Sequence, residues 1–221
     1  MSHHQRPAVP EVVLEPLDDG SARPSVLQQL AALGLVAGPV AFVAAWATAG
    51  VATEGYSAVQ QAISELAAVD APHRSIVTLG LVAYGAYLLA AVPLLRRSAI
   101  GACWPAVAVN ALATWAVAAL PLHRSDLVDL AHGVAATVGY VSLAAAPALA
   151  VAPLTRTGRS AAGTASALAA AAIAMALSAS TWVDANGLAQ RVGLGIGDLW
   201  LVAVGLSLAG GRLGPTPPQR D

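Results

Sequence analysis

The sequence predicts an all-α integral membrane protein whose six transmembrane helices form three hairpins, with a short amphipathic outer helix in the first connection. Of its 221 residues, 57% are apolar and only 10% are charged, whereas a soluble domain carries about a quarter charged residues. The apolar residues gather in six runs of about twenty, the length that crosses the hydrocarbon core of a bilayer. Composition and run length together indicate a lipid bilayer as the surrounding solvent.

The predicted helices are the apolar runs at residues 26–50, 75–95, 100–120, 127–153, 161–183 and 192–210. Each reaches about 30 Å at a rise of 1.5 Å per residue. Residues 1–25 and 211–221 are polar and rich in proline, and we expect them to form cytoplasmic tails, the first of them disordered. The transmembrane domain is then residues 26–210.

The arginines predict the orientation. All eleven basic residues are arginines, and eight of them lie in the tails and in the second and fourth connections. Arg74, Arg124 and Arg191 lie on the other side. Because positive residues are retained in the cytoplasm, we expect a cell-membrane protein with both termini inside.

Small residues predict how the helices pack. Gly34 and Gly38 in the first run, and Gly193 and Gly197 in the last, have the four-residue spacing that lets helix backbones approach closely in lipid. The single cysteine, Cys103, cannot form an internal disulfide and is expected to be a small apolar filler.

Possible chemistry is concentrated on the predicted outer side. Seven of the twelve acidic residues lie in or beside the outer connections, whereas the inner connections between helices have none. We expect the polar residues there to form an outer-rim network, whose candidate members are Ser64, His73, Arg74, His123, Asp126, Arg191 and Asp198.

The first outer connection has the pattern of a short helix. Ser57 and Gln60 fit a capping box, and the apolar positions after them recur with helical spacing. This helix is expected either to lie on the lipid headgroups or to fold inward over the bundle as a lid.

The fourth run begins with Asp126 and Asp129, whose charges are favourable in the first turn of a helix. Asp129 and His132 are three residues apart and share a face, which allows them to bind one metal ion or exchange a proton. The alternative is that His132, about 9 Å into the helix, makes a hydrogen bond with a neighbouring helix.

Asp198 is expected inside the outer leaflet, because a helix that began there would be too short to span. An ionisable group at that depth costs at least ~2.5 kcal/mol on insertion scales and needs a partner. The candidate partners are Arg191 or Arg74 as a counter-charge and His132 as a hydrogen-bond or proton partner. Asn110, midway along the third run, is expected to make an interhelical hydrogen bond.

Residues 63–66, residues 123–132, and Gly187-Leu188 with Arg191 resemble the bacterial membrane family known as domain of unknown function 998. The similarity spans roughly residues 26–210. It implies a six-helix integral membrane fold, and the family brings no established substrate, cofactor or catalytic residue.

A fainter resemblance is to the membrane hydrolases that include alkaline ceramidases, in which Ser, Asp and three His residues surround an intramembrane zinc. The corresponding residues here are Ser64, Glu65, His73, Asp129 and His132. The chain departs from that pattern in having six predicted helices instead of seven and no closing pair of histidines.

Three function classes follow. The first is a binding or structural membrane module whose acidic, His-containing outer rim takes a lipid headgroup or a partner membrane protein. The second is an outward-facing hydrolase or transferase on a lipid-like substrate, with zinc on Asp129 and His132 and Glu65 as general base. The third is proton-linked transport of a small solute through Asp198, Asp129 and His132. A nucleic-acid or nucleotide partner is not expected, because the sequence has no basic cluster and no phosphate-binding loop.

Overall fold

The computed structural model describes residues 24–214. In this part of the chain six helices are long and apolar enough to cross a membrane, so the predicted all-α, multi-pass fold is confirmed. They are α1 (Val26–Ala52), α2 (Arg74–Arg97), α3 (Trp104–Ala119), α4 (Asp126–Arg156), α5 (Ser160–Ala179) and α6 (Asn186–Ala209). The predicted tail residues 1–23 and 215–221 lie outside the described residues.

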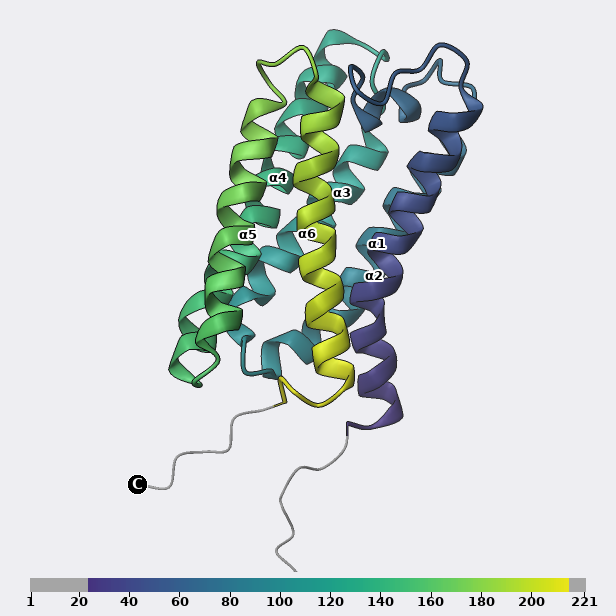
Figure 1. Cartoon of the computed structure of the whole chain (residues 1–221). Coiled ribbons are helices and arrows are strands. Elements are labelled where there is room, and N and C mark those ends of the chain that lie inside the picture. Colours follow the sequence, from purple (N-terminus) through teal and green to yellow (C-terminus); the bar gives the residue numbers. More distant parts are fainter. Residues whose placement is uncertain (1–23, 215–221) are drawn as a thin grey trace, which may run out of the picture.

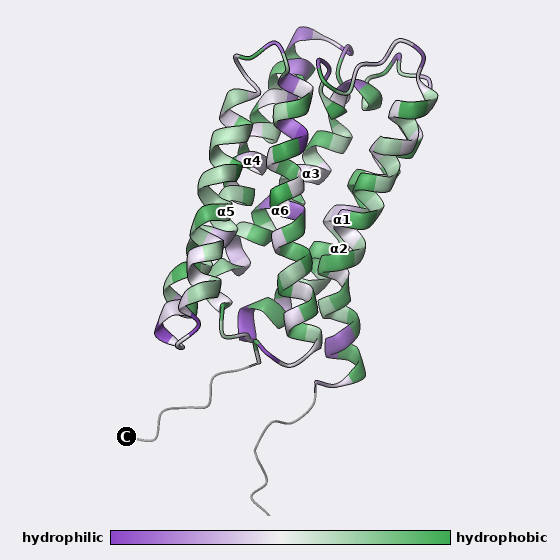
Figure 2. Cartoon of the chain, viewed as in Figure 1, coloured by the Kyte–Doolittle hydropathy of each residue, from purple (hydrophilic) through white to green (hydrophobic). Residues whose placement is uncertain are grey.

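The helices form one bundle in chain order (Figure 1). Each helix packs against the next, and α6 closes the bundle by packing against α1. The connections 53–73, 120–125 and 180–185 lie at one end, which we call the polar end. The connections 98–103 and 157–159, with the flanking residues 24–25 and 210–214, lie at the opposite end, which we call the tail end. Hydrophilic residues gather at both ends of the bundle and are sparse between them (Figure 2).

Close helix contacts form at the glycines expected to mediate them. A Cβ atom on Gly34 would lie 2.8 Å from the backbone oxygen of Tyr87 on α2, and one on Gly197 would lie 2.6 Å from the side chain of Leu143 on α4. Only glycine leaves room for these approaches, as predicted for packing in lipid. Cys103 is fully buried, as expected of a small filler.

The last helix begins six residues earlier than predicted, at Asn186 instead of residue 192. The apolar run begins only after Gln190 and Arg191, but both side chains bond to the first connection and therefore fit inside a helix. Asp198 is consequently the thirteenth of 24 residues in α6. It stands at the middle of the helix, and its expected place inside the outer leaflet stays a prediction.

The helical segment of the first connection is the five-residue 3₁₀ helix η1 (Ile63–Ala67), which folds inward over the bundle with Ile63 and Leu66 buried. The predicted capping residue Ser57 closes a turn before it. The Gln60 N–H donates to Ser57 Oγ at 3.3 Å, while the side chain of Gln61, instead of Gln60, accepts from the Ser57 N–H at 2.7 Å.

Candidate functional site

Arg191 ties the first connection to the start of α6. Its Nη1 donates to three backbone carbonyls, those of Ala58, Gln61 and Gly187, at 2.8, 3.0 and 2.9 Å. Its Nη2 donates to the Tyr56 hydroxyl, and the guanidinium lies 5.0 Å from the centre of a Trp46 ring. A Cβ atom on Gly187 would come within 2.2 Å of the Gln61 oxygen. The first connection is thus held tightly over the bundle.

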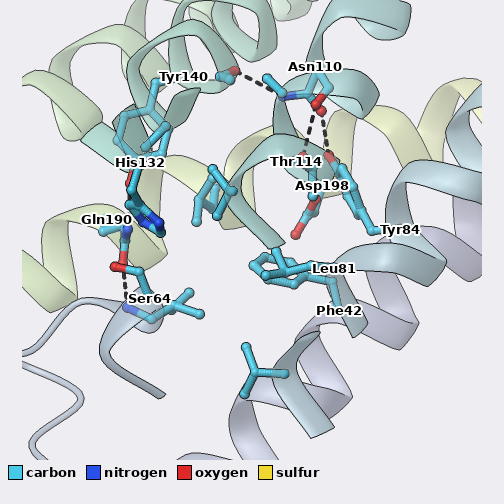
Figure 3. Close-up of a pocket in the computed structure, with 17 residues that line it drawn as sticks. Phe42, Ser64, Leu81, Tyr84, Asn110, Thr114, His132, Tyr140, Gln190 and Asp198 are labelled. Atoms are coloured by element: carbon cyan, nitrogen blue, oxygen red, sulfur yellow. Dashed lines mark hydrogen bonds between the residues drawn. The ribbon is translucent and has the colours of Figure 1, made fainter. Parts of the chain in front are cut away.

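Beneath this connection, a cavity of about 80 Å³ lies among η1, α1, α2, α3, α4 and α6, and its lining reaches to about the middle of these helices (Figure 3). Its polar lining residues are Ser64, Tyr84, Asn110, Thr114, His132, Tyr140, Gln190 and Asp198. A water molecule needs about 10–15 Å³ of such volume, so this space accommodates several waters or one small solute. The remaining lining is apolar.

The Gln190 side chain connects η1, which covers the cavity, to α4, which forms part of its wall. Its Oε1 accepts from the Ile63 backbone N–H at 2.7 Å, and its Nε2 donates to the Tyr140 hydroxyl on α4. One buried amide therefore joins η1, α4 and α6.

Two cavity residues have partners on neighbouring elements. Asn110 donates to the Gly139 carbonyl on α4 at 2.9 Å and accepts from the Tyr84 hydroxyl on α2 at 3.0 Å, which confirms the expected interhelical bond. The Nδ1 of His132 lies 2.6 Å from the Leu120 carbonyl. Because a carbonyl only accepts, Nδ1 carries the hydrogen, and Nε2 of the neutral ring is an acceptor.

Asp198 is only 6% exposed, and its carboxyl lies beside the Tyr84 hydroxyl. Within residues 24–214, its carboxyl forms no ion pair with an arginine or a histidine. The prediction that Arg191 or Arg74 is the counter-charge of Asp198 is therefore wrong. Arg191 binds loop carbonyls and is seven residues away, about 10 Å along the helix, and Arg74 is exposed at the start of α2. His132 lines the same cavity.

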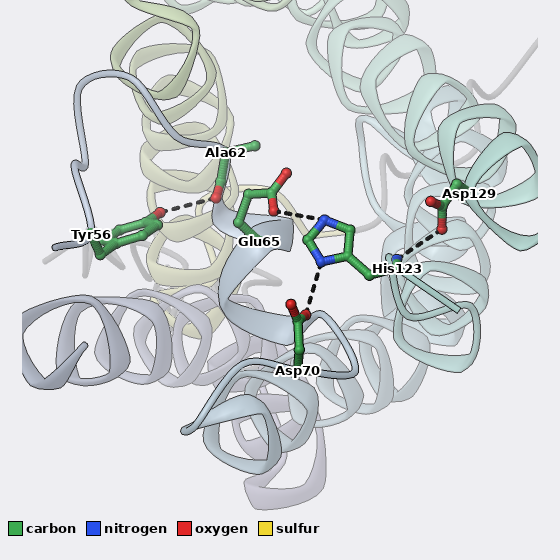
Figure 4. A network of polar contacts seen from close by, with 6 residues as sticks. All are labelled: Tyr56, Ala62, Glu65, Asp70, His123 and Asp129. Atoms are coloured by element: carbon green, nitrogen blue, oxygen red, sulfur yellow. Dashed lines mark hydrogen bonds and ion pairs between the residues drawn. The ribbon is translucent and has the colours of Figure 1, made fainter. Parts of the chain in front are cut away.

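At the polar end, His123 joins the first connection to the connection between α3 and α4 (Figure 4). Its Nδ1 lies 2.8 Å from Asp70 Oδ1, and its Nε2 lies 3.3 Å from Glu65 Oε2. Its backbone N–H donates to Asp129 Oδ1 at 3.0 Å. We call His123, Glu65, Asp70 and Asp129 the polar-end network.

In this network His123 and the carboxylates each favour the charged form of the other. The hydrogen bond with Asp70 raises the pKa of His123, and the nearby carboxylates of Glu65 and Asp129 act in the same direction. The same hydrogen bond lowers the pKa of Asp70. The folded protein therefore favours an imidazolium held between two carboxylates, which supports a structural role for this network.

The other predicted rim residues do not join the polar-end network. Asp126 is exposed in the first turn of α4, and His73 Nε2 lies 3.3 Å from the Ala52 carbonyl. Asp129 bonds to the His123 backbone, whereas His132 faces the cavity. No cluster of three His, Cys, Asp or Glu side chains suited to a metal ion occurs in the described part of the chain, and zinc binding by Asp129 and His132 stays a prediction.

Sequence reasoning found Ser64, Asn110, His132 and Asp198 but missed Tyr84, Thr114, Tyr140 and Gln190 as members of one site. The available signal for Tyr84 and Tyr140 was a hydroxyl far from either end of an apolar run. A buried Tyr usually finds a hydrogen-bond partner, so such a residue predicts a polar interior.

Residues 36–207 match the family described as "Protein of unknown function (DUF998)". No curated protein and no solved structure matches the chain. The matched range reaches from α1 to α6 and includes all the residues of the cavity and of the polar-end network. The chain therefore belongs to the DUF998 family of multi-pass membrane proteins.

Proposed function

We propose that this protein is a binding module of the cell membrane, with both termini in the cytoplasm, that holds a small amine-bearing cation in the cavity. The observation that carries this proposal is the carboxyl of Asp198, which is buried, borders a cavity and forms no ion pair within the described residues. An ionised carboxyl is costly to bury unless it is paired, and intramembrane acids commonly mark ligand sites.

The lining favours a ligand with N–H donors. Asp198 is an acceptor when ionised, and Nε2 of neutral His132 is another. A small ammonium ion supplies a positive charge and several donors, so it satisfies both groups at once. The hydroxyls of Tyr84 and Thr114 add adaptable hydrogen-bonding groups to the wall.

The contacts at the polar end favour this interior site over the outer rim as the place of binding. His123 pairs with Glu65 and Asp70, and the two Nη groups of Arg191 donate to backbone carbonyls and Tyr56. These groups already bond within the chain and are therefore less available to an external headgroup.

The same geometry favours binding over transport or hydrolysis. The cavity-lining residues reach from the polar end to about the middle of the helices, where Asn110 and Asp198 lie, and none comes from the tail-end third of a helix. Glu65, the candidate general base, pairs with His123 outside the cavity.

The test is a comparison of unfolding temperatures in detergent. Ammonium, methylammonium and ethanolammonium chlorides are each compared with sodium chloride at equal ionic strength. We expect at least one amine to stabilise the wild type, by about 2.7 kcal/mol at a concentration 100 times its Kd, and to have no effect on Asp198→Asn. Asp126→Asn, which removes one exposed carboxyl from the start of α4, is the matched control and keeps the response. An equal response in Asp198→Asn, or no response to any amine, refutes the proposal.

A further inference from the structure

The tail end of the bundle is basic. Its described residues include five arginines, namely Arg96, Arg97, Arg156, Arg159 and Arg212. Residues 24–52, 93–103, 153–163 and 207–214 contain no acidic residue. The positive charge at this end is therefore not offset within the described chain, in contrast to the polar end.

Two of these arginines border a crevice of about 290 Å³ between α5 and α6. Its walls are mainly apolar and include Leu154, Ala165 and Ala203, and Ser166 and Ser207 are its uncharged polar wall residues. Both alanines are exposed, so the crevice opens on the surface of the bundle where lipid is expected. Small side chains on the facing helices leave the space that a bulkier pair would fill.

A backbone contact brings the two arginines together at the mouth of the crevice. Arg159 Nη2 donates to the Arg212 carbonyl at 2.8 Å, which fixes the turn after α6 against the start of α5. Figure 1 shows this turn crossing from α6 toward the connection between α4 and α5. Both side chains are exposed, and neither forms an ion pair within the described residues.

We propose that this crevice binds one anionic phospholipid, with its phosphate at Arg159 and Arg212 and one acyl chain between α5 and α6. Guanidinium groups match the geometry of phosphate oxygens, and basic pockets between transmembrane helices are suited to anionic headgroups. The walls suit a hydrocarbon chain better than a free anion, because Leu154, Ala165 and Ala203 are apolar and the Ser166 hydroxyl already bonds to Trp200. A cationic mouth over an apolar crevice thus complements an anionic amphiphile. This site is separate from the cavity at Asp198.

The probe is an equimolar mixture of phosphatidylglycerol and phosphatidylcholine, added to the detergent-purified full chain. Native mass spectrometry then counts the lipid that each protein retains. We expect the wild type to retain phosphatidylglycerol in preference to phosphatidylcholine, and the double variant Arg159→Gln/Arg212→Gln to lose about 90% of that retention. The matched control, Arg96→Gln/Arg97→Gln, removes the same charge from the same end but lies outside the crevice, and it keeps the lipid.

A second variant distinguishes a lipid-binding crevice from general electrostatic attraction between the arginines and anionic lipid. Ala165→Phe/Ala203→Phe leaves all the arginines in place and fills the crevice, so it is expected to lose phosphatidylglycerol while keeping its helical circular dichroism. Excess inorganic phosphate is expected not to displace the lipid. Equal losses in the two arginine pairs, equal retention of the two lipids, displacement by phosphate, or full retention in the filled variant each overturns the proposal.

Discussion

The polar-end network and the cavity beneath it each contain a histidine and at least one carboxyl group. The histidine and carboxylates of the network contact one another, whereas the carboxyl in the cavity forms no ion pair in the described part of the chain. His123 is exposed and contacts Asp70 and Glu65 directly, so each charge has a partner in the chain. Asp198 is buried beside a cavity and has no ion-pair partner within residues 24–214. The difference separates groups that assemble the fold from the group at which we propose that a ligand binds.

Charge density alone does not locate a binding site in a membrane protein. The acids of the polar end lie in the connections or in the first turn of α4, and Glu65, Asp70 and Asp129 contact His123. The cavity has a single carboxyl, but at that depth an unpaired charge is more costly than at the surface. Burial without a partner is therefore the more informative property.

The largest expected effect tests the groups that assemble the fold. Arg191→Gln removes the donors to the carbonyls of Ala58 and Gln61 and to the Tyr56 hydroxyl. Because hydrogen bonds to charged groups are worth about 1.5–3 kcal/mol, we expect a loss of ~3 kcal/mol in the free energy of unfolding, measured with denaturant in detergent. Limited proteolysis should also become faster within residues 53–62.

The control for this effect is Arg74→Gln, which removes the same charge from an exposed position at the start of α2. Its expected change is within about 0.5 kcal/mol. Equal stability of the two variants would show that Arg191 does not hold the first connection in place.

For a substitution of Asp198 we expect a gain in stability instead of a loss. Asp198→Asn keeps the shape of the side chain and removes a buried charge, so in the absence of amines we expect the variant to be more stable than the wild type by ~2 kcal/mol at neutral pH. Thermal unfolding in detergent with sodium as the only cation measures this. A less stable variant would mean that the carboxylate has a stabilising partner in the resting protein, and the contrast with the polar-end network would disappear.

The fold was predictable because the lipid environment imposes a length and composition that six separate segments satisfy. The start of α6 was not, since Gln190 and Arg191 bond to residues of the first connection that are more than 120 positions earlier in the chain. The site was predictable only in part for the same reason. Asn110, His132 and Asp198 are conspicuous in apolar runs, but which of them share a cavity depends on contacts between distant helices.

The smallest expected effect is the pH dependence of the polar-end network. His123 has a raised pKa in the folded protein, so its contribution to stability is fully present below its unfolded pKa of about 6.5 and is lost as the pH rises through the higher folded value. Asp70 has a lowered pKa, so its contribution is present above its unfolded pKa of about 3.9 and is lost as the pH falls through the lower folded value. The two windows overlap between about pH 4 and pH 6.5.

The contribution of the network is measured by comparing the unfolding temperatures of the wild type and of His123→Asn from about pH 4 to pH 9. The difference between the two proteins should be greatest from about pH 4 to 6.5 and should shrink at higher pH, where the wild-type imidazole is neutral. Asp70→Asn should remove most of the same dependence, because it deletes the shorter of the two contacts. Since these groups are exposed, added salt should reduce the difference as well. A difference that stays constant from pH 5 to pH 9 would mean that the His123 side chain acts through its uncharged contacts instead of its charge, because asparagine keeps the backbone N–H that bonds to Asp129.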